Sequence, residues 1–303
     1  MAFVLRRCGN LCAVRRRIEQ CAVFVVITAA ASGCGITSAT TPRPATHTPR
    51  AAAPVVTPST VVRAVPGATS TLTVPAPTTS TPSGLPLAGL TVGVDPGHNG
   101  MNYANPGVID TQVWNGRNYE DCNTTGTETD SGFTEAQFNW NVSQYLEADL
   151  VGAGARVVLT RTSNDGIGPC VDVRSRILNT TNIAVAIHAD GGPPTGRGFA
   201  VLEPVADGIN SGAVASSMSF GTTIRDTFAS VAGMPISTYD GTSGIALRSD
   251  LAGTNLTTVP YVLIECGNMR NATDAALLVT STFQQRAALA LTEAIEAYEM
   301  QGH

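Results

Sequence analysis

The sequence contains no lysine, so arginine supplies every long cationic side chain in its 303 residues. We attribute this absence to genome composition rather than to chemistry. Between residues 35 and 86 the chain also lacks acidic residues and the aromatic residues Phe, Trp and Tyr. This stretch is mostly Thr, Pro, Ala, Val and Ser, and it would bury too little apolar surface to offset the entropy lost on ordering. We therefore expect residues 35–87 to be a disordered tether.

The apolar run near the N-terminus, residues 22–31, is too short to span a bilayer as a helix. It follows a stretch rich in arginine and precedes small residues, which is the pattern of an export signal. A buried core helix is disfavoured because low-complexity sequence follows the run. We therefore assign residues 1–34 to a signal peptide.

The signal ends in Ala31-Ser32-Gly33-Cys34, which resembles the lipobox of bacterial lipoproteins, although Ala31 stands where Leu is usual. Two outcomes stay open at this point. A lipid on Cys34 would attach the chain to the outer face of the cytoplasmic membrane, whereas simple cleavage would release it beyond that membrane.

The remaining residues, 88–303, are enough to bury one sizeable core, and we expect one folded domain. They hold 22 of the 23 acidic residues and ten of the 18 arginines, which leaves an excess of 12 negative charges. A domain of this charge is a poor binder of nucleic acid or of anionic membrane surfaces. We expect no nucleic-acid partner and a monomeric chain.

Three cysteines belong to this domain, because the other four lie in the signal or at its end. In an exported protein, the polar and glycine-rich surroundings of Cys122 and Cys170 favour a disulfide between them. Two free surface thiols are the alternative. Cys266 lies in an apolar run and is expected to be an inert buried thiol.

Five apolar runs predict buried strands, at residues 90–94, 155–160, 183–187, 199–202 and 259–264. Apolar residues at helical spacing predict helices over residues 134–151, 171–178, 213–231 and 283–298, with Thr134 placed to cap the first. Strands that alternate with helices indicate an α/β fold, with a mostly parallel sheet and helices on both faces. Binding sites in such sheets form at the carboxyl ends of the strands.

Outside the tether and the last residue there are only two histidines, and each follows the end of a predicted strand. Taken singly, His98 and His188 are more often structural, but two at equivalent positions favour a shared metal ion. A catalytic zinc takes three protein ligands and leaves a fourth position for water. Glu135 is the best third ligand, since it opens the helix that follows the first strand; its alternative role is to stabilise that helix's dipole.

Glu265 ends the apolar run Tyr261-Val262-Leu263-Ile264. A carboxylate there is costly to bury unless it is paired or takes part in acid–base chemistry. Alternate side chains of a strand point to opposite faces, so Cys266 should face a helix layer if Glu265 faces the site. A salt-bridged carboxylate is the alternative for Glu265.

In combination, these residues resemble the zinc-dependent N-acetylmuramoyl-L-alanine amidases of the type 3 amidase family. The resemblance spans nearly the whole domain and rests on Asp95-Pro96-Gly97-His98-Asn99-Gly100, Thr134-Glu135, Arg174 with Asn179, Ile187-His188-Ala189, and Ile264-Glu265-Cys266-Gly267 with Asn271. It implies that His98, Glu135 and His188 bind Zn²⁺ at the carboxyl edge of the strands, and that Glu265 is the catalytic residue. It also implies hydrolysis of the amide between N-acetylmuramic acid and L-alanine in peptidoglycan, in the periplasm or cell envelope.

Two departures from the family pattern affect the expected cleft without removing a ligand: Ala186 replaces a Ser, and Asn268 replaces a Phe. Residues 101–133 are polar and glycine-rich, so we expect a loop or hairpin beside the site, tied down by Cys122, that restricts which peptides enter. Asp95 and Asn99 are both candidates to orient a metal-bound imidazole.

Two other classes of function stay in view. Another zinc hydrolase of the wall, a peptidase or a sugar deacetylase, would release a different product. A non-catalytic wall-binding or regulatory module would be expected to lose a ligand or the catalytic carboxylate, and this chain keeps all four residues.

Overall fold

The computed structural model describes residues 84–302. The expected signal peptide, Cys34 and most of the expected tether lie outside the described residues. Leu87, the last residue assigned to the tether, is buried, and its N–H donates to the carbonyl oxygen of Ala153 at 2.9 Å. Leu87 therefore belongs to the folded domain.

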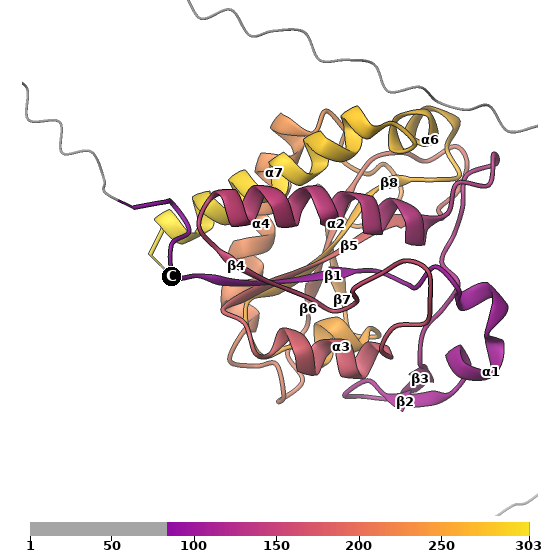
Figure 1. Cartoon of the computed structure of the whole chain (residues 1–303), viewed down its shortest axis with the longest axis horizontal. Helices are drawn as coiled ribbons and strands as arrows, with labels where there is room; N and C mark the ends of the chain where they lie inside the picture. The colour runs from indigo at the N-terminus through magenta and orange to yellow at the C-terminus, as the bar shows by residue number, and fades with distance from the viewer. Residues whose placement is uncertain (1–83, 303) are drawn as a thin grey trace, which may run out of the picture. The chain divides into compact units, whose positions relative to one another are not determined.

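Six strands form one sheet in the order β4-β1-β5-β8-β6-β7 (Figure 1). Neighbours are parallel throughout, except that β6 is antiparallel to β8. The bounds are β1 Thr91–Pro96, β4 Arg156–Leu159, β5 Ile183–Asp190, β6 Ala200–Pro204, β7 Ile245–Arg248 and β8 Tyr261–Asn268. The prediction of a mostly parallel sheet is confirmed, and β7 is a strand that the apolar pattern missed because it is short and half exposed.

Three long helices cover one face of the sheet: α2 Glu135–Gly152, α4 Val214–Val231 and α7 Ser281–Met300 (Figure 1). The shorter helices α3 Val171–Leu178 and α5 Ala252–Leu256 pack on the other face. The remaining helical segments are η1 Asn102–Ala104, α1 Pro106–Ile109 and α6 Ala272–Leu278. Helices on both faces therefore match the sequence prediction.

Helix α2 shows how local sequence positions the site. The Thr134 hydroxyl oxygen accepts a hydrogen bond from the Gln137 N–H at 3.3 Å, so the predicted cap is present. Apolar side chains recur every fourth residue along the helix and are fully buried: Phe138, Val142, Leu146 and Leu150. Packing of this stripe on the sheet fixes the first turn of α2, and with it Glu135, at the carboxyl edge of the strands.

The two faces of the sheet carry side chains of different size. The face under α2, α4 and α7 holds the main core, with several buried Phe and Leu side chains. The face under α3 and α5 carries small residues, among them Ala184, Ala186 and Ala200. Ala186, one of the two departures noted above, thus lies in the floor of this second layer.

The long segment before α2 was expected to form a loop or hairpin, and it contains a hairpin made of β2 Gln112–Trp114 and β3 Tyr119–Asp121. The structure contains the Cys122–Cys170 disulfide, which joins the end of this hairpin to the start of α3. Cys266 is a buried free thiol in the main core, on the opposite side of β8 from the second layer. Within residues 84–302 no helix is both long enough and apolar enough to cross a membrane.

Candidate metal centre and active site

The structure brings together the three side chains that the sequence pattern singled out as ligands. His98 follows β1, His188 lies in β5, and Glu135 opens α2. Atoms of the three that can bind a metal all lie within 4.8 Å of one another. Among residues 84–302, they form the only cluster of three or more His, Cys, Asp or Glu side chains with this spacing.

Glu135 lies between the two imidazoles. Its Oε2 lies 3.0 Å from His98 Nε2, and its Oε1 lies 2.9 Å from His188 Nδ1. The imidazole rings meet edge to face, with centroids 4.9 Å apart. Two ring nitrogens and one carboxylate converging on one point form the donor set of a catalytic zinc site with three protein ligands. The residues present therefore fit this metal.

The electrostatics of the cluster are those of a buried ion pair. Burial alone would raise the pKa of the Glu135 carboxyl, but the two imidazoles hold it well below its usual range. Burial alone would lower the pKa of His98, but Glu135 raises it. Glu135 is thus an anion at neutral pH, as a metal ligand has to be.

A short strap, residues 124–127, crosses the cluster and contacts two of its members. The Thr124 carbonyl oxygen lies 3.0 Å from His98 Nδ1, so this nitrogen carries the proton and donates to it. In the neutral ring this hydrogen bond retains the Nδ1 proton, so Nε2, the nitrogen that faces Glu135, is the one that can bind a metal ion once its proton is lost. The Thr127 N–H donates to Glu135 Oε2 at 3.0 Å.

The strap, rather than Asp95 or Asn99, orients the His98 ring. The side chains of Asp95 and Asn99, both candidates from the sequence, hydrogen bond elsewhere: Asp95 accepts from Thr160 and Arg174, and Asn99 accepts from Arg174. The group that orients the ring is the backbone carbonyl of Thr124. A backbone carbonyl gives no signal in the sequence, so the pattern could not reveal it.

The turn that carries His98 is held by two buried arginines. His98 has a φ of 59°, a left-handed conformation that is uncommon for residues other than glycine. Arg174 donates to the carbonyl oxygens of Pro96 and His98 at 2.8 and 2.7 Å. Arg161 donates to the same Pro96 oxygen at 2.8 Å. These bonds fix the backbone on both sides of the turn.

Arg161 is a positioning residue that the sequence reasoning missed. It directly follows the predicted strand over residues 155–160, so the strand-end rule that selected both histidines could have found it. It was missed because an arginine beside a polar loop is usually a solvated surface residue. In the structure it is buried and also lies 5.1 Å from the centre of the Trp140 ring.

Glu265 lies next to the cluster, opposite His188 in the register of β5 and β8. Its Oε2 is buried and has no hydrogen-bond partner among the described residues. Burial raises the pKa of the Glu265 carboxyl well above its usual range, and the negative charge of Glu135 raises it further. The salt bridge considered as the alternative for this residue is not among the ion pairs of the described residues.

Asn268, the second departure from the family pattern, is fully buried in β8. Its Nδ2 donates to the carbonyl oxygens of Pro193 and Gly196, at 2.8 Å each. It therefore ties the loop that follows β5 to the end of β8, close to the cluster. A Phe at this position could make neither hydrogen bond.

A cavity of about 310 Å³ opens beside the cluster, on the face of the sheet that α3 and α5 cover. Its lining includes His98 and His188, the hairpin residues Glu120 and Asp121, and Tyr261 from β8. The cavity thus connects the candidate metal ligands with the hairpin.

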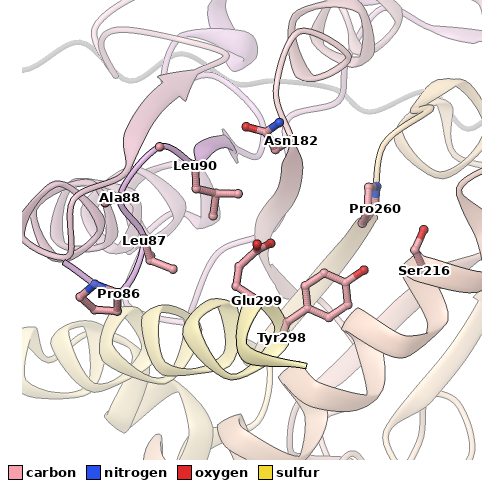
Figure 2. A pocket seen from close by; sticks show the side chains of 10 residues that line it. Pro86, Leu87, Ala88, Leu90, Asn182, Ser216, Pro260, Tyr298 and Glu299 are labelled. Atoms are coloured by element: carbon pink, nitrogen blue, oxygen red, sulfur yellow. The ribbon is translucent and has the colours of Figure 1, made fainter. Parts of the chain in front are cut away.

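A second cavity, of about 560 Å³, lies where the chain enters the domain (Figure 2). Its walls include Leu90, Asn182 and Pro260, which precede β1, β5 and β8, so it lies at the amino ends of these strands. In parallel sheets the chemistry is expected at the other edge. The larger volume therefore does not make this cavity the active site.

Comparison with known proteins gives one consistent result. A model of the family described as N-acetylmuramoyl-L-alanine amidase matches residues 92–297. An N-acetylmuramoyl-L-alanine amidase of Mycobacterium tuberculosis is 40% identical over 217 residues, which cover 70% of this chain and 87% of that protein.

Solved structures agree. The crystal structure of an N-acetylmuramyl-L-alanine amidase from Mycobacterium smegmatis is 40% identical, has a TM-score of 0.66, and is matched over 71% of this chain and 99% of that one. The apo form of such an amidase from Mycobacterium abscessus is 41% identical, with a TM-score of 0.65 and coverages of 70% and 99%. An amidase structure from Clostridium difficile, 18% identical with a TM-score of 0.54, covers 72% of this chain and 100% of its own and shows that the fold is shared.

Proposed function

The chain belongs to the N-acetylmuramoyl-L-alanine amidase family and hydrolyses the amide between N-acetylmuramic acid and L-alanine in peptidoglycan, and we propose that it does so with a zinc ion held by His98, Glu135 and His188. The observation that carries the proposal is the convergence of three ligand atoms within 4.8 Å next to Glu265, whose buried Oε2 has no hydrogen-bond partner within residues 84–302. As a cell-wall amidase the protein acts in the cell envelope.

The proposed ligands are prepared for a cation. Glu135 is ionised, and the Thr124 carbonyl retains the proton on His98 Nδ1, so that Nε2 is the nitrogen that would coordinate in place of its contact with Glu135. When bound, zinc would polarise the lactyl carbonyl, lower the pKa of a water molecule towards about 7, and lower the raised pKa of the neighbouring Glu265 carboxyl.

Glu265 is the proposed general base and then the general acid. Its carboxylate takes a proton from the attacking water and delivers that proton to the departing nitrogen of L-alanine. The support for this role is positional: Glu265 lies opposite His188 across two paired strands, and one of its oxygens is buried without a hydrogen-bond partner among the described residues.

The test is a digestion of peptidoglycan with the purified protein, residues 35–303, with and without a chelator. We expect a new L-alanine amine as the product, and loss of activity on chelation that added Zn²⁺ restores. Release of acetate or of an internal peptide amine would identify a deacetylase or a peptidase instead. No product under any condition, with zinc bound, would favour the non-catalytic module.

Two variants separate binding from catalysis. Glu265→Gln should retain zinc, measured by elemental analysis, but lose hydrolysis. His98→Ala should lose both. Full activity of Glu265→Gln would remove this residue from the mechanism while leaving the metal site intact.

Three finer points about the whole chain are also proposals. Residues 1–34 direct export, and the chain is a monomer. For Cys34, palmitate labelling of the wild type and of Cys34→Ser in the producing cell decides between lipidation and simple cleavage. Sedimentation of residues 35–303 measures the oligomeric state.

A further inference from the structure

In the part of the chain that the structure describes, the exposed aromatic side chains all lie between residues 103 and 119. They are Tyr103, Trp114 and Tyr119, with 72%, 47% and 70% of their surface accessible. Trp114 and Tyr119 face each other across the hairpin, with ring centroids 5.4 Å apart and planes inclined by 67°. Scattered exposed apolar residues are ordinary, but two rings in contact form a small apolar surface that faces water.

The same face of the hairpin carries polar groups beside the rings. Gln112 pairs with Asp121, as Trp114 pairs with Tyr119, so the strand alternation puts all four side chains on one face. The Gln112 Nε2 donates to Asp121 Oδ1. This face therefore offers flat aromatic rings followed by amide and carboxylate groups. Sugar rings need this combination, because their C–H faces stack on aromatic rings while hydroxyl and N-acetyl groups hydrogen bond at the edge.

The opposite face holds the hairpin rigidly. Glu120 Oε1 accepts from the Ala252 N–H of α5 at 3.1 Å. At the hairpin turn, Arg117 Nη2 donates to the carbonyl oxygens of Val205 and Ala206, at 3.0 Å each. The disulfide at Cys122 anchors the end of β3. The aromatic pair is therefore preorganised, so binding a ligand there costs little ordering entropy.

The hairpin borders the active-site cavity at the end of β3, where Glu120 and Asp121 contribute to the lining. Asp121 lines the same cavity as His98 and His188. It follows Tyr119 by two residues on the same face, which corresponds to about 7 Å along the strand. This is about the size of one sugar ring.

We propose that Trp114 and Tyr119 form a stacking platform for a sugar of the glycan strand next to the N-acetylmuramic acid whose amide is cleaved. This inference rests on the proposed function and assigns the hairpin to the glycan rather than to the stem peptide. An uncharged N-acetylated sugar suits the site, because the nearest charged group on this face, Asp121, is negative and would repel the carboxylates of a stem peptide.

The test compares two substrates that share the cleaved bond: N-acetylmuramoyl-L-alanyl-D-isoglutamine, with one sugar, and a tetrasaccharide carrying the same dipeptide. Trp114→Ala should raise KM for the tetrasaccharide about tenfold, equivalent to ~1.4 kcal/mol, with little change in kcat. The one-sugar substrate should be cleaved as by the wild type. Trp114→Phe keeps a ring and should restore most of the lost affinity, and Leu289→Ala, an exposed residue of α7, serves as the surface control.

Binding of peptide-free chitotetraose, measured by isothermal titration calorimetry, gives a result that depends neither on hydrolysis nor on a tryptophan signal. Binding of chitotetraose to the wild type and not to Trp114→Ala supports the platform. If neither substrate is cleaved, the proposed function fails, but this binding result still stands. No binding to either protein overturns the platform. An equal rise in KM for both substrates would assign the rings to the muramoyl dipeptide. A loss of self-association with unchanged KM would assign them to a contact with a second copy of the chain. Either result overturns the proposal.

Discussion

Replacement of Arg174 by Met tests whether the turn that carries His98 is held by charge. Arg174 is 2% exposed, and its guanidinium forms an ion pair with Asp95, with 2.6 Å between Nη1 and Oδ1. It also donates to three backbone carbonyl oxygens and to the side chain of Asn99. Methionine fills similar volume but leaves Asp95 as a buried anion without its counter-charge.

The uncompensated charge of Asp95 sets the loss of folding stability that we expect for Arg174→Met. Removal of one partner of a buried ion pair typically destabilises by about 3–5 kcal/mol. Arg174→Lys should fall between the wild type and Arg174→Met, because an ammonium keeps the charge but cannot donate in the fork that Asp95 and the carbonyls receive. Combined with Asp95→Asn, the Met variant should cost at least about 1 kcal/mol less than the sum of the two single changes.

The stability that the Asp95–Arg174 ion pair contributes should decrease as the pH falls. Burial would raise the pKa of the Asp95 carboxyl, but Arg174 and Thr160 hold it below its usual range. A depressed folded-state pKa contributes stability above the unfolded pKa of about 3.9, and this contribution is lost as the pH falls through the folded value. The difference in the free energy of unfolding between the wild type and Arg174→Met should therefore become smaller at acidic pH.

Urea unfolding of the wild type, Arg174→Met, Asp95→Asn and the double variant measures these free energies of unfolding. Zinc titration of the same proteins measures a second quantity, the affinity of the metal site. Because the His98 carbonyl loses its donor, we expect the Met variant to bind zinc about 10–100-fold more weakly. A destabilisation below about 1 kcal/mol, or additive costs in the double variant, would refute the charge argument. Unchanged zinc affinity would show that the turn keeps its shape without Arg174.

Three further predictions concern other parts of the domain. A Cβ at Gly126 would lie 2.7 Å from Glu135 Oε2, so Gly126→Ala should weaken zinc binding in a titration, whereas Gly132→Ala, with a similar positive φ but nothing within 4 Å, should not. Burial raises the pKa of Glu203 to about 7, so the folded state holds more protons than the unfolded state between the usual value of 4.5 and 7. Stability should fall as the pH rises through this window, by up to about 3 kcal/mol, and urea titrations of Glu203→Gln should lack most of the slope; an unchanged slope would exclude this carboxyl as its source. Cys170→Ser opens a disulfide that spans 48 residues and should cost about 4 kcal/mol in the chain-entropy picture, and a reductant should lower the melting temperature of the wild type but not of the variant.

Much of the fold could be predicted because its signals are local. The continuous apolar runs predicted five of the six strands of the sheet, and helical spacing predicted α2, α3, α4 and α7 to within about two residues. The elements that were missed, including α5 and α6, are short, and their stability comes from packing rather than from a repeating apolar pattern. The antiparallel orientation of β6 could not be read either, because a strand's residues do not record its direction.

The candidate site divides in the same way. The positions of His98 and His188 after apolar runs, and of Glu135 at a helix start, are properties of the nearby sequence, and the rule for parallel sheets places all three at one edge. What the pattern could not supply is the group that holds each side chain. Thr124 acts through a backbone carbonyl, and Arg161 acts from a strand end that looked like surface.

The amino-acid order was thus sufficient for the α/β architecture, the family and the candidate chemistry, because strand ends, helix caps and a few polar residues in apolar surroundings are recorded within short stretches. The tautomer of His98, the cavity shared by the ligands and the hairpin, and the exposure of Trp114 and Tyr119 depend on contacts between segments far apart in the chain. Such contacts form only when the sheet and its two helix layers are assembled, so no local pattern could specify them.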